Sequence, residues 1–528
     1  MFRSIQNIFS PKNKKINKIK NQFISGSAGF LDLSMISSGF NGDKVNFFNG
    51  FGLTADLRII DLRLLQFRSL QLLRENSFAN SIFGRLETKV INTGLRLRST
   101  PPSEILSFFL TDNELQEWSG NTEKLFEVWS KDKRLVSFSG KYTFGQLQRI
   151  VYRTALLSGD CLIILSINKL GLPVIELVDG INIASPFISD SKNIVHGVEL
   201  DTNGQEIAFH VIVDNYGNKF KRISAFTVKG QRRAWLVRAT ETRIDDIRGL
   251  PLLSVVMQNI NEIGKYMDSE QRAALVNSYV AVVHNVSEKA PSNNPFSKAA
   301  LNSDSVTNAT TGDSADFKKM QPGFFATKLS AGETISSFDT KRPNVNFGPF
   351  VEFVIKTIAH ALEIPPEVLL LEFDSNFSAS RQAKLDFNDY VQKAISIFSE
   401  SFCQPVYNEW LTGMILTNQI NSPGYIDSLI NLKDWAVLGA WRSAVWRGLP
   451  NKSVDELKQV KALEIISSMG WMTNTQIADE YFGTDYSDNV RKLLKEREAN
   501  GIVKNNSNDI IEEMSNKLDD FITSFEVK

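Results

Sequence analysis

The spacing of apolar residues predicts three long amphipathic helices. In residues 56–90, 144–157 and 252–285, apolar positions recur every three or four residues, with charged or amide side chains between them. That spacing places the apolar side chains on one face of a helix. Thr143 stands immediately before the second segment, where a threonine commonly caps the first turn. Gly94 follows the first segment, which is expected to end before it.

Short runs rich in branched and aromatic residues predict strands between the second and third helices. A turn at residues 158–160 leads into an apolar run, and further candidates lie at residues 174–178, 195–201 and 206–213. Turn-forming residues separate these candidates. The chain from about residue 50 to residue 245 is therefore predicted to form an α/β or α+β module.

The pattern changes after the third helix. Residues 286–316 are rich in Ser, Asn, Ala, Thr and Asp, carry little apolar periodicity, and are predicted to be a flexible loop. Short β-like runs follow at residues 324–329 and 333–338. A helix over residues 350–362 is expected to stop before Pro365, because a proline disfavours helical geometry in the residue before it.

A polar stretch with small side chains, NFSASR at residues 376–381, then leads into a helix that is expected to continue to Phe402. The last hundred residues are predicted to be mostly helical. Trp435, Trp441 and Trp446 lie there at near-helical spacing. They are interpreted either as contacts between subunits or as packing within one chain, since aromatic residues are frequent in both settings.

Composition narrows the class of protein without identifying it. The 528 residues exceed one ordinary hydrophobic core, so two to four modules are expected, and 42% hydrophobic with 22% charged residues is a globular composition. The 59 basic residues equal the 59 acidic ones, which argues against tight binding to nucleic acid or anionic lipid through bulk charge. Two distant cysteines, Cys161 and Cys403, suggest no disulfide framework and fit a reducing compartment. Neither a signal peptide nor a membrane span is recognisable, so synthesis in the cytosol is expected.

Five lysines near the N-terminus form a basic tail, interpreted as a solvated end or as a contact for phosphate or membrane. These are Lys12, Lys14, Lys15, Lys18 and Lys20.

No motif that supports catalysis stands out. The four histidines are far from one another and from the cysteines, so no zinc spacing is present, and no phosphate-binding Gly-rich segment ending in Lys and Ser or Thr occurs. Gly50-Phe51-Gly52 only imitates a dinucleotide fingerprint, because no buried strand precedes it. Neither a metal nor a cofactor is expected. Carboxylates are abundant, so spacing alone leaves an acid-dependent nuclease open.

Several segments, taken in order, resemble the portal proteins of tailed bacteriophages, in particular the lambda-like portal family. The similarity spans roughly residues 55–500. The segments that carry it are the helix with RENSFANSIFGRLETKVINTGLRL, TFGQLQRIVYRTALLSGDCLI, the strand pair with Gly197, Val198, Glu199, Asp201, Gly204, Phe209 and His210, the helix start with Arg248, Gly249 and Pro251, and the series from Gly-Glu through Arg-Pro-Asn and Ile-Pro to Phe377-Ser378-Ala379-Ser380-Arg381. The family's last motif reads Tyr-Ser-Ser-Ala-Arg, so phenylalanine here replaces a tyrosine.

The resemblance implies an α+β protomer with several regions that assembles into a ring, typically of twelve copies. The implied regions are an N-terminal basic tail at 1–45, an α/β wing at 46–247, a first stem helix at 248–285, a small α/β clip with a flexible loop at 286–345, a second stem helix at 346–364, a tunnel loop at 365–380, a wing helix at 381–429 and a helical crown at 430–528. Such rings occupy one vertex of a capsid in the virion, and they are not enzymes.

The tunnel loop is the implied functional site, because it projects toward DNA in the channel. The candidate residues are Glu367, Glu372, Asp374, Ser375, Asn376, Ser378, Ser380 and Arg381. Small side chains let neighbouring backbones pack closely around the channel, and an excess of acids weakens adhesion of the moving duplex, because each cation fixed on a phosphate adds to binding. The alternative interpretation is a solvated acidic surface loop.

The resemblance also implies partners. These are further copies of the chain, the terminase large subunit, head-completion or adaptor proteins, the major capsid or scaffold protein, and double-stranded DNA, with no membrane. Two other functions remain open from the residues: a different ring-forming virion connector, and a DNA-cleaving enzyme of the packaging machinery.

Overall fold

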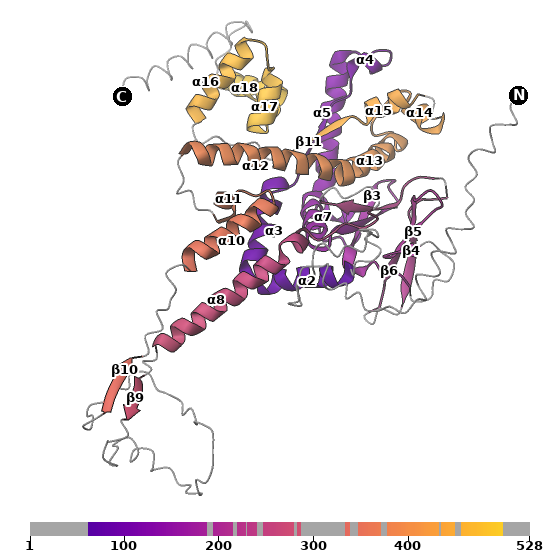
Figure 1. The fold of residues 1–528 in the computed structure, drawn as a ribbon. Coiled ribbons are helices and arrows are strands. Elements are labelled where there is room, and N and C mark those ends of the chain that lie inside the picture. The colour runs from indigo at the N-terminus through magenta and orange to yellow at the C-terminus, as the bar shows by residue number, and fades with distance from the viewer. Residues whose placement is uncertain are drawn as a thin grey trace, which may run out of the picture. The chain divides into compact units, whose positions relative to one another are not determined.

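A computed structural model describes eleven stretches of the chain. They are residues 62–186, 194–214, 219–228, 230–239, 246–278, 282–286, 333–337, 347–370, 377–431, 434–448 and 456–499. Figure 1 labels the helices and strands of the chain, which divides into two compact units, each built from separate segments. Unit 1 comprises Met1–Glu87, Ile150–Ser166 and Ile175–Phe398, and unit 2 comprises Thr88–Arg149, Ile167–Val174 and Ser399–Lys528.

The described part of unit 1 contains a three-stranded sheet and a four-stranded sheet, besides a two-stranded pair described below. The first has the order β3-β2-β8, and the second has the order β4-β5-β6-β7. Their strands are β2 (Asp160–Ile167), β3 (Pro173–Asp179), β8 (Ala234–Arg238), β4 (Ile194–Val195), β5 (Val198–Leu200), β6 (Glu206–Ile212) and β7 (Phe220–Ser224). Buried side chains from both sheets, among them Leu162, Leu236 and Phe209, form one hydrophobic cluster. The strands predicted at residues 174–178 and 206–213 are confirmed, whereas β7 and β8 were not singled out. The strand predicted at residues 195–201 is wrong in one respect, because a turn at His196 and Gly197, both with positive φ, divides it between the antiparallel strands β4 and β5.

The first described helices of the chain correct one prediction. The single helix predicted over residues 56–90 is two helices, α2 (Leu62–Glu75) and α3 (Ser77–Val90). Asn76 lies between them, and its Oδ1 accepts a hydrogen bond from the Ala79 backbone N–H at 3.0 Å. An asparagine caps a helix better than it continues one, which explains the break.

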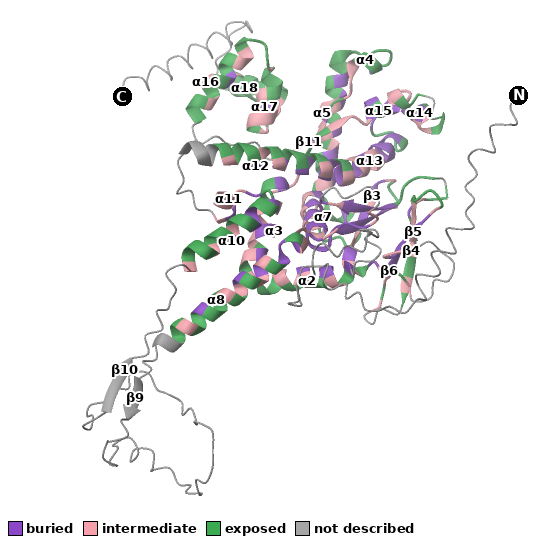
Figure 2. Ribbon diagram, in the orientation of Figure 1, coloured by how far each residue is buried: buried purple, intermediate pink, exposed green. Residues whose placement is uncertain are grey.

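Further helices of unit 1 follow β8 in the sequence. They are α8 (Met257–Ser278), α10 (Phe347–Ala361), α11 (Pro366–Leu370) and α12 (Phe377–Phe398), with 3₁₀ turns at Gly180–Asn182 and Leu252–Val255. Many residues of α8 and α12 are exposed (Figure 2). The predicted helix over 252–285 ends earlier than expected, at Ser278. Its last part is instead the strand β9 (Val282–Val286), which pairs antiparallel with β10 (Glu333–Ser337). The run Val-Val-His-Asn-Val has the branched side chains that suit a strand.

The capping prediction at Thr143 is confirmed. Helix α7 (Phe144–Ser158) begins directly after it, with reciprocal hydrogen bonds between Thr143 and Gln146. The helix then leads through Gly159 into β2, as the turn at residues 158–160 predicted.

Unit 2 is organised around a cluster of aromatic rings. The ring of Phe126, on α5 (Asp112–Lys131), lies 5.0 Å from Trp410 and 5.7 Å from Trp446 between centroids. Trp410 lies on α13 (Gln404–Leu416), and Trp446 lies on β11 (Ala444–Arg447), which pairs with β1 (Arg96–Ser99).

The near-helical spacing of the three tryptophans was therefore misleading. Trp441 ends α15 (Trp435–Trp441) and is buried, Trp435 is 75% exposed, and Trp446 is in a strand. In β11 successive side chains point to opposite faces, so that Val445 is exposed and Trp446 is buried. This local pattern is that of a strand.

The remaining elements of unit 2 are helical. They are α4 (Ser103–Leu106), α6 (Lys133–Val136), a π-helical turn (Ser399–Cys403), α14 (Tyr425–Asn431), α16 (Glu456–Ser468), α17 (Asn474–Phe482) and α18 (Tyr486–Ala499). Helices and small antiparallel sheets confirm the α+β class.

Candidate functional site

Two helices of unit 1 pack along one another and border the region in which the functional loop was predicted. The ring of Tyr266 on α8 lies 5.3 Å from Phe347 and 5.3 Å from Phe350 on α10, between centroids. Both helices lie side by side in Figure 1. Between them in sequence the β9–β10 pairing joins Val286 to Glu333, so the chain that leaves α8 is brought back to α10.

A buried ion pair fixes where the segment leading to α8 starts. The Arg248 guanidinium bonds both carboxylate oxygens of Asp160, with Nε to Oδ2 at 2.6 Å and Nη2 to Oδ1 at 2.7 Å. Both side chains are essentially inaccessible to solvent, at 1% and 0% of their surface. Asp160 is the first residue of β2, so the pair ties the strand to the chain that enters α8.

Every donor of Arg248 is used. Besides the two bonds to Asp160, Nη2 donates to the carbonyl of Gly180 at 2.7 Å, and Nη1 donates to the carbonyls of His196 at 2.8 Å and Ile183 at 3.2 Å. The guanidinium has five N–H groups, and these five bonds match them. A buried charge is tolerated only when it is paired and fully hydrogen-bonded, and this one is.

Two glycines let the backbones approach at the same place. A β-carbon on Gly159 would lie 2.2 Å from the Gly249 carbonyl oxygen, and one on Gly249 would lie 2.0 Å from the Gly159 carbonyl oxygen. The Gly249 N–H also donates to Asp160 Oδ2 at 3.0 Å. Gly159, Asp160, Arg248 and Gly249 are called the anchor below.

The end of α10 turns sharply toward α11. Glu363 has a left-handed backbone with φ of 56°, and the Ile364 N–H donates to the Ala359 carbonyl at 3.0 Å. Leu362 and Ile364 are buried on either side of the exposed Glu363. The turn therefore buries its apolar neighbours and leaves one carboxylate outside.

Burial and this carboxylate act on a tyrosine of α12. Burial raises the pKa of Tyr390 to about 12, and the negative charge of Glu363 contributes in the same direction. The Tyr390 ring stacks on Phe387 at 5.8 Å. The turn and α12 thus belong to one packed region of unit 1.

One comparison with known families identifies the chain. A model described as "Phage portal protein, lambda family" matches residues 50–394, about two thirds of the sequence. The chain belongs to this family. It is thus a structural component that forms a portal ring at a capsid vertex.

Comparison with solved structures gives distant similarities. They are the neck of an empty GTA particle computed with C6 symmetry (TM-score 0.43, 11% identity, 78% of this chain and 92% of that chain), the virion of a native gene transfer agent particle (0.37, 12%, 78% and 92%), and the neck of a native GTA particle computed with C12 symmetry (0.35, 12%, 75% and 98%). No curated protein matches the sequence. At these TM-scores and identities, the solved structures assign no function to any residue of this portal protein.

The structure describes only some of the residues predicted for the tunnel loop. Glu367 is half-buried in the first turn of α11. Glu372, Asp374, Ser375 and Asn376 lie outside the described residues, so the grouping of the candidates around one site stays a prediction. Ser378, Ser380 and Arg381 belong to the first turns of α12, where the backbone alone is described.

The segment predicted as a loop over residues 365–380 contains helical parts at both ends. Residues Pro366–Leu370 form α11, and α12 begins four residues earlier than the expected position 381, while residues 371–376 lie outside the described part of the chain. Serine and alanine are acceptable in a first helical turn, which agrees with the early start of α12.

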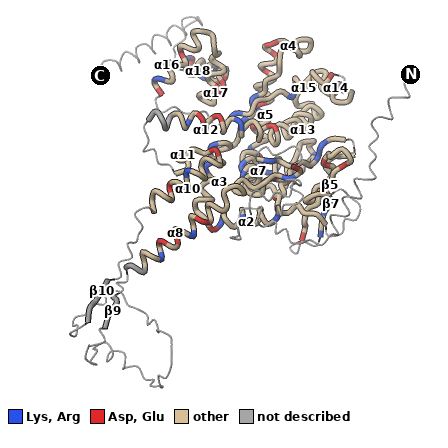
Figure 3. The backbone as a smooth tube through the Cα atoms, viewed as in Figure 1, with Lys and Arg blue, Asp and Glu red and all other residues tan. Residues whose placement is uncertain are grey.

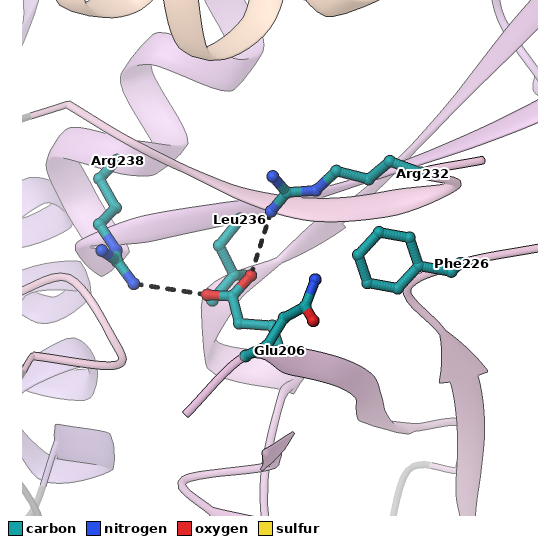
Figure 4. A pocket seen from close by; sticks show the side chains of 6 residues that line it. Glu206, Phe226, Arg232, Leu236 and Arg238 are labelled. Carbon is teal, nitrogen blue, oxygen red and sulfur yellow. Dashed lines mark hydrogen bonds and ion pairs between the residues drawn. The ribbon is translucent and has the colours of Figure 1, made fainter. Parts of the chain in front are cut away.

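Sequence reasoning missed a polar pocket in the sheets of unit 1. A cavity of about 240 Å³ is lined by Gln205, Glu206, Phe226, Arg232, Leu236 and Arg238 (Figure 4). The Glu206 carboxylate lies 3.3 Å from the Arg232 guanidinium and 3.6 Å from that of Arg238. Burial raises the pKa of Glu206, and the two arginines oppose that shift. Because two cations hold the carboxylate, it is not a free base.

Within the described stretches, no three His, Cys, Asp or Glu side chains lie close enough to hold a metal ion. The same stretches contain no helix that is long and apolar enough to cross a membrane. Acidic and basic residues are interspersed along α8 (Figure 3).

Proposed function

We propose that rings of this portal protein form the channel through which double-stranded DNA is packaged by a terminase and later leaves the particle. Membership of the lambda portal family over residues 50–394 is the observation that carries the proposal. The ring is proposed to contain about twelve copies, as the resemblance to the family implies, arranged with closed cyclic symmetry around an axial hole. Synthesis in the host cytoplasm precedes incorporation at the capsid vertex.

The helix pair supports a stem. Helices α8 and α10 pack through Tyr266, and the strands β9 and β10 close the excursion between them. We assign residues 286–345 to a clip that meets the terminase large subunit and later the head-completion or adaptor proteins. The major capsid or scaffold protein is the remaining proposed partner.

The segment from Pro365 to Ser380 is proposed to face the DNA. Glu363 precedes it, and Glu367, Glu372 and Asp374 lie within it, while the first cations that follow are Arg381 and Lys384. Repeated around a ring, this acidic excess would keep the duplex centred and reduce its adhesion, since binding to phosphates depends on fixed cations. Passage of DNA requires no nucleophile, and we propose that the protein is not an enzyme.

The test is the mass and symmetry of the purified protein, by native mass spectrometry together with negative-stain class averages. Closed rings of about twelve subunits with an axial hole are expected. A small closed oligomer without an axial opening, at concentrations that saturate assembly and with scaffold protein present, would contradict the proposal. Metal-dependent cleavage of DNA by the same preparation would contradict the non-enzymatic role.

A further inference from the structure

The three C-terminal helices α16–α18 cannot be stabilised by their own core. In the described residues 456–499, only Leu463 and Ala478 are buried. A segment of this size needs far more apolar burial, or an external support, to hold its structure.

Part of the support comes from charged contacts with the rest of unit 2. Arg98 on β1 donates to Asp485 Oδ2 at 2.6 Å, and Lys124 on α5 lies 3.2 Å from Asp488 Oδ1. Arg447 on β11 bonds Glu480 on α17 at 3.0 Å. The helices are thus attached to their own chain through acidic side chains rather than through apolar ones.

These contacts leave the apolar face of α18 uncovered. Tyr486, Val490, Leu493 and Leu494 fall at positions i, i+4, i+7 and i+8, which share one face of a helix. They are 39%, 37%, 40% and 43% exposed. Asp488, which binds the body of unit 2, lies two residues after Tyr486 and so on the opposite face. These four residues are called the α18 stripe.

A second exposed apolar surface lies on the same helical segment. Ile465, Met469 and Trp471 follow one another through the end of α16 and the turn after it, and Trp471 is 74% exposed. These three residues are called the α16 surface. A ring with cyclic symmetry needs two different complementary surfaces on each copy, one that docks and one that receives.

We propose that in the assembled ring the α18 stripe of each copy docks on the α16 surface of the adjacent copy. The proposal rests on the proposed function, because it takes the ring as given and assigns one of its contacts. A second copy is the favoured occupant since the ring places an identical helical segment beside each one, and this chain carries both surfaces. The contact supplies the apolar burial that α16–α18 lack within one chain.

The test measures how fast an introduced thiol reacts with a maleimide. Val490→Cys places the thiol in the stripe, and the control Lys495→Cys places it on the exposed polar side of the same helix. The native Cys161 and Cys403 are both buried, so they contribute little background. In rings, Cys at position 490 should react at least about tenfold more slowly than in unassembled chains, as for a contact open less than a tenth of the time. The control thiol should react at similar rates in both states.

Two further variants identify the occupant. Trp471→Asp should restore the reactivity at position 490 in rings, whereas Trp435→Asp, at an equally exposed tryptophan outside α16–α18, should not. A chain that ends at Ala499 should retain the protection. Loss of protection in that chain would assign the stripe to residues 500–528 and overturn the proposal.

Other outcomes are equally decisive. Equal reactivity of position 490 in rings and in unassembled chains would overturn the docking while leaving the portal function intact. Protection already present in unassembled chains would show that the chain covers its own stripe. Native mass spectra of the same samples report ring formation separately, so absence of rings would count against the proposed function itself and would overturn the docking with it.

Discussion

Arg248 determines where the chain leaves the sheets of unit 1 and begins the approach to α8. Its guanidinium carries five hydrogen bonds to Asp160 and to three backbone carbonyls, all in a buried site. A lysine has one ammonium group and cannot reproduce this planar arrangement. Arg248 therefore holds segments of the chain together and takes no part in a reaction, since its charge is fully paired.

Replacement of this arginine is expected to be costly. Arg248→Ala leaves the Asp160 carboxylate buried and unpaired, and should lower the free energy of unfolding by about 3–5 kcal/mol. The control Arg232→Ala breaks an ion pair whose arginine is 55% exposed, and should cost at most about 1 kcal/mol. Thermal unfolding midpoints of both variants, measured beside the unchanged protein, check the prediction. Equal shifts in the two variants would contradict it.

Glu123 is expected to make stability depend on pH in unit 2. Burial raises the pKa of this carboxyl from 4.5 to about 6, against the opposing effect of Arg98. The folded state therefore binds the proton more tightly than the unfolded state. Its contribution is fully present below pH 4.5 and is lost as the pH rises through about 6, a change of about 2 kcal/mol.

The variant Glu123→Gln removes this titration while keeping an acceptor for the Ser99 N–H, which now bonds Glu123 Oε1 at 2.8 Å. Relative to the unchanged protein, the variant should gain thermal stability between pH 4.5 and pH 6 and show no further change above about pH 7. Unfolding midpoints across that pH range provide the measurement. A constant difference between the two proteins would show that Glu123 does not titrate there.

At the junction between the start of β2 and the chain that enters α8, there is no room for a side chain. Gly159, at the start of β2, and Gly249, before α8, approach so closely that neither can carry a β-carbon. The helix pair α8 and α10, in contrast, meets through the rings of Tyr266, Phe347 and Phe350. The position of α8 thus depends on two kinds of contact. The chain before it lies against the start of β2 through glycines, and the helix itself packs on α10 through aromatic rings.

Gly249→Ala is expected to displace the start of this segment. The added methyl would lie 2.0 Å from the Gly159 carbonyl oxygen, a backbone atom that cannot rotate away. The control Gly120→Ala, on α5, has no heavy atom within 4 Å of its β-carbon and should be neutral or slightly stabilising, because alanine favours helices. Yield of folded protein and resistance to limited proteolysis compare the two. A folded Gly249→Ala protein of unchanged stability would contradict the prediction.

The sequence was informative wherever a single element determined its own pattern. Thr143 predicted the start of α7, and Pro365 predicted the end of α10, because caps and prolines act locally. The pattern failed where a distant partner decided the outcome. Trp446 joins a strand because β1 pairs with it, and residues 282–286 form β9 because β10 pairs with them.

The candidate site was less predictable than the fold. Acidic and small residues at 365–380 were visible in the sequence, and their arrangement in space stays a prediction. Glu206 and its two arginines come together only when β6 and β8 lie near one another. The spacing of these residues in the sequence does not predict that contact. The anchor joins residues 88 positions apart.

In a ring, each charge or substitution of one chain is repeated in every copy. A change of one residue alters every copy at once, and charges that face a common channel act together on the DNA within it. The acids at residues 363–374, which are proposed to face the channel, would form such a set, since each copy would contribute the same excess.

Reversing one of these charges should make the channel adhere to DNA. Glu367→Lys adds two units of positive charge per copy, so rings should retain duplex DNA at low salt, with a log-log salt slope steeper by roughly 0.9 per added phosphate contact. Packaging in vitro should slow accordingly. The control Glu104→Lys makes the same change at an exposed position on α4, outside the proposed channel segment. Equal retention by the two variants would argue against a channel position for Glu367.

The anchor has a consequence for tracing descent among portal proteins whose sequences have diverged almost completely. Its four positions constrain one another: the carboxylate needs the guanidinium, and the two glycines need each other. Such a set should be inherited or lost as a unit, whereas the surrounding residues vary independently. A Gly-Asp pair and an Arg-Gly pair, separated by a stretch of strands, would then serve as a marker of ancestry that survives when overall identity does not.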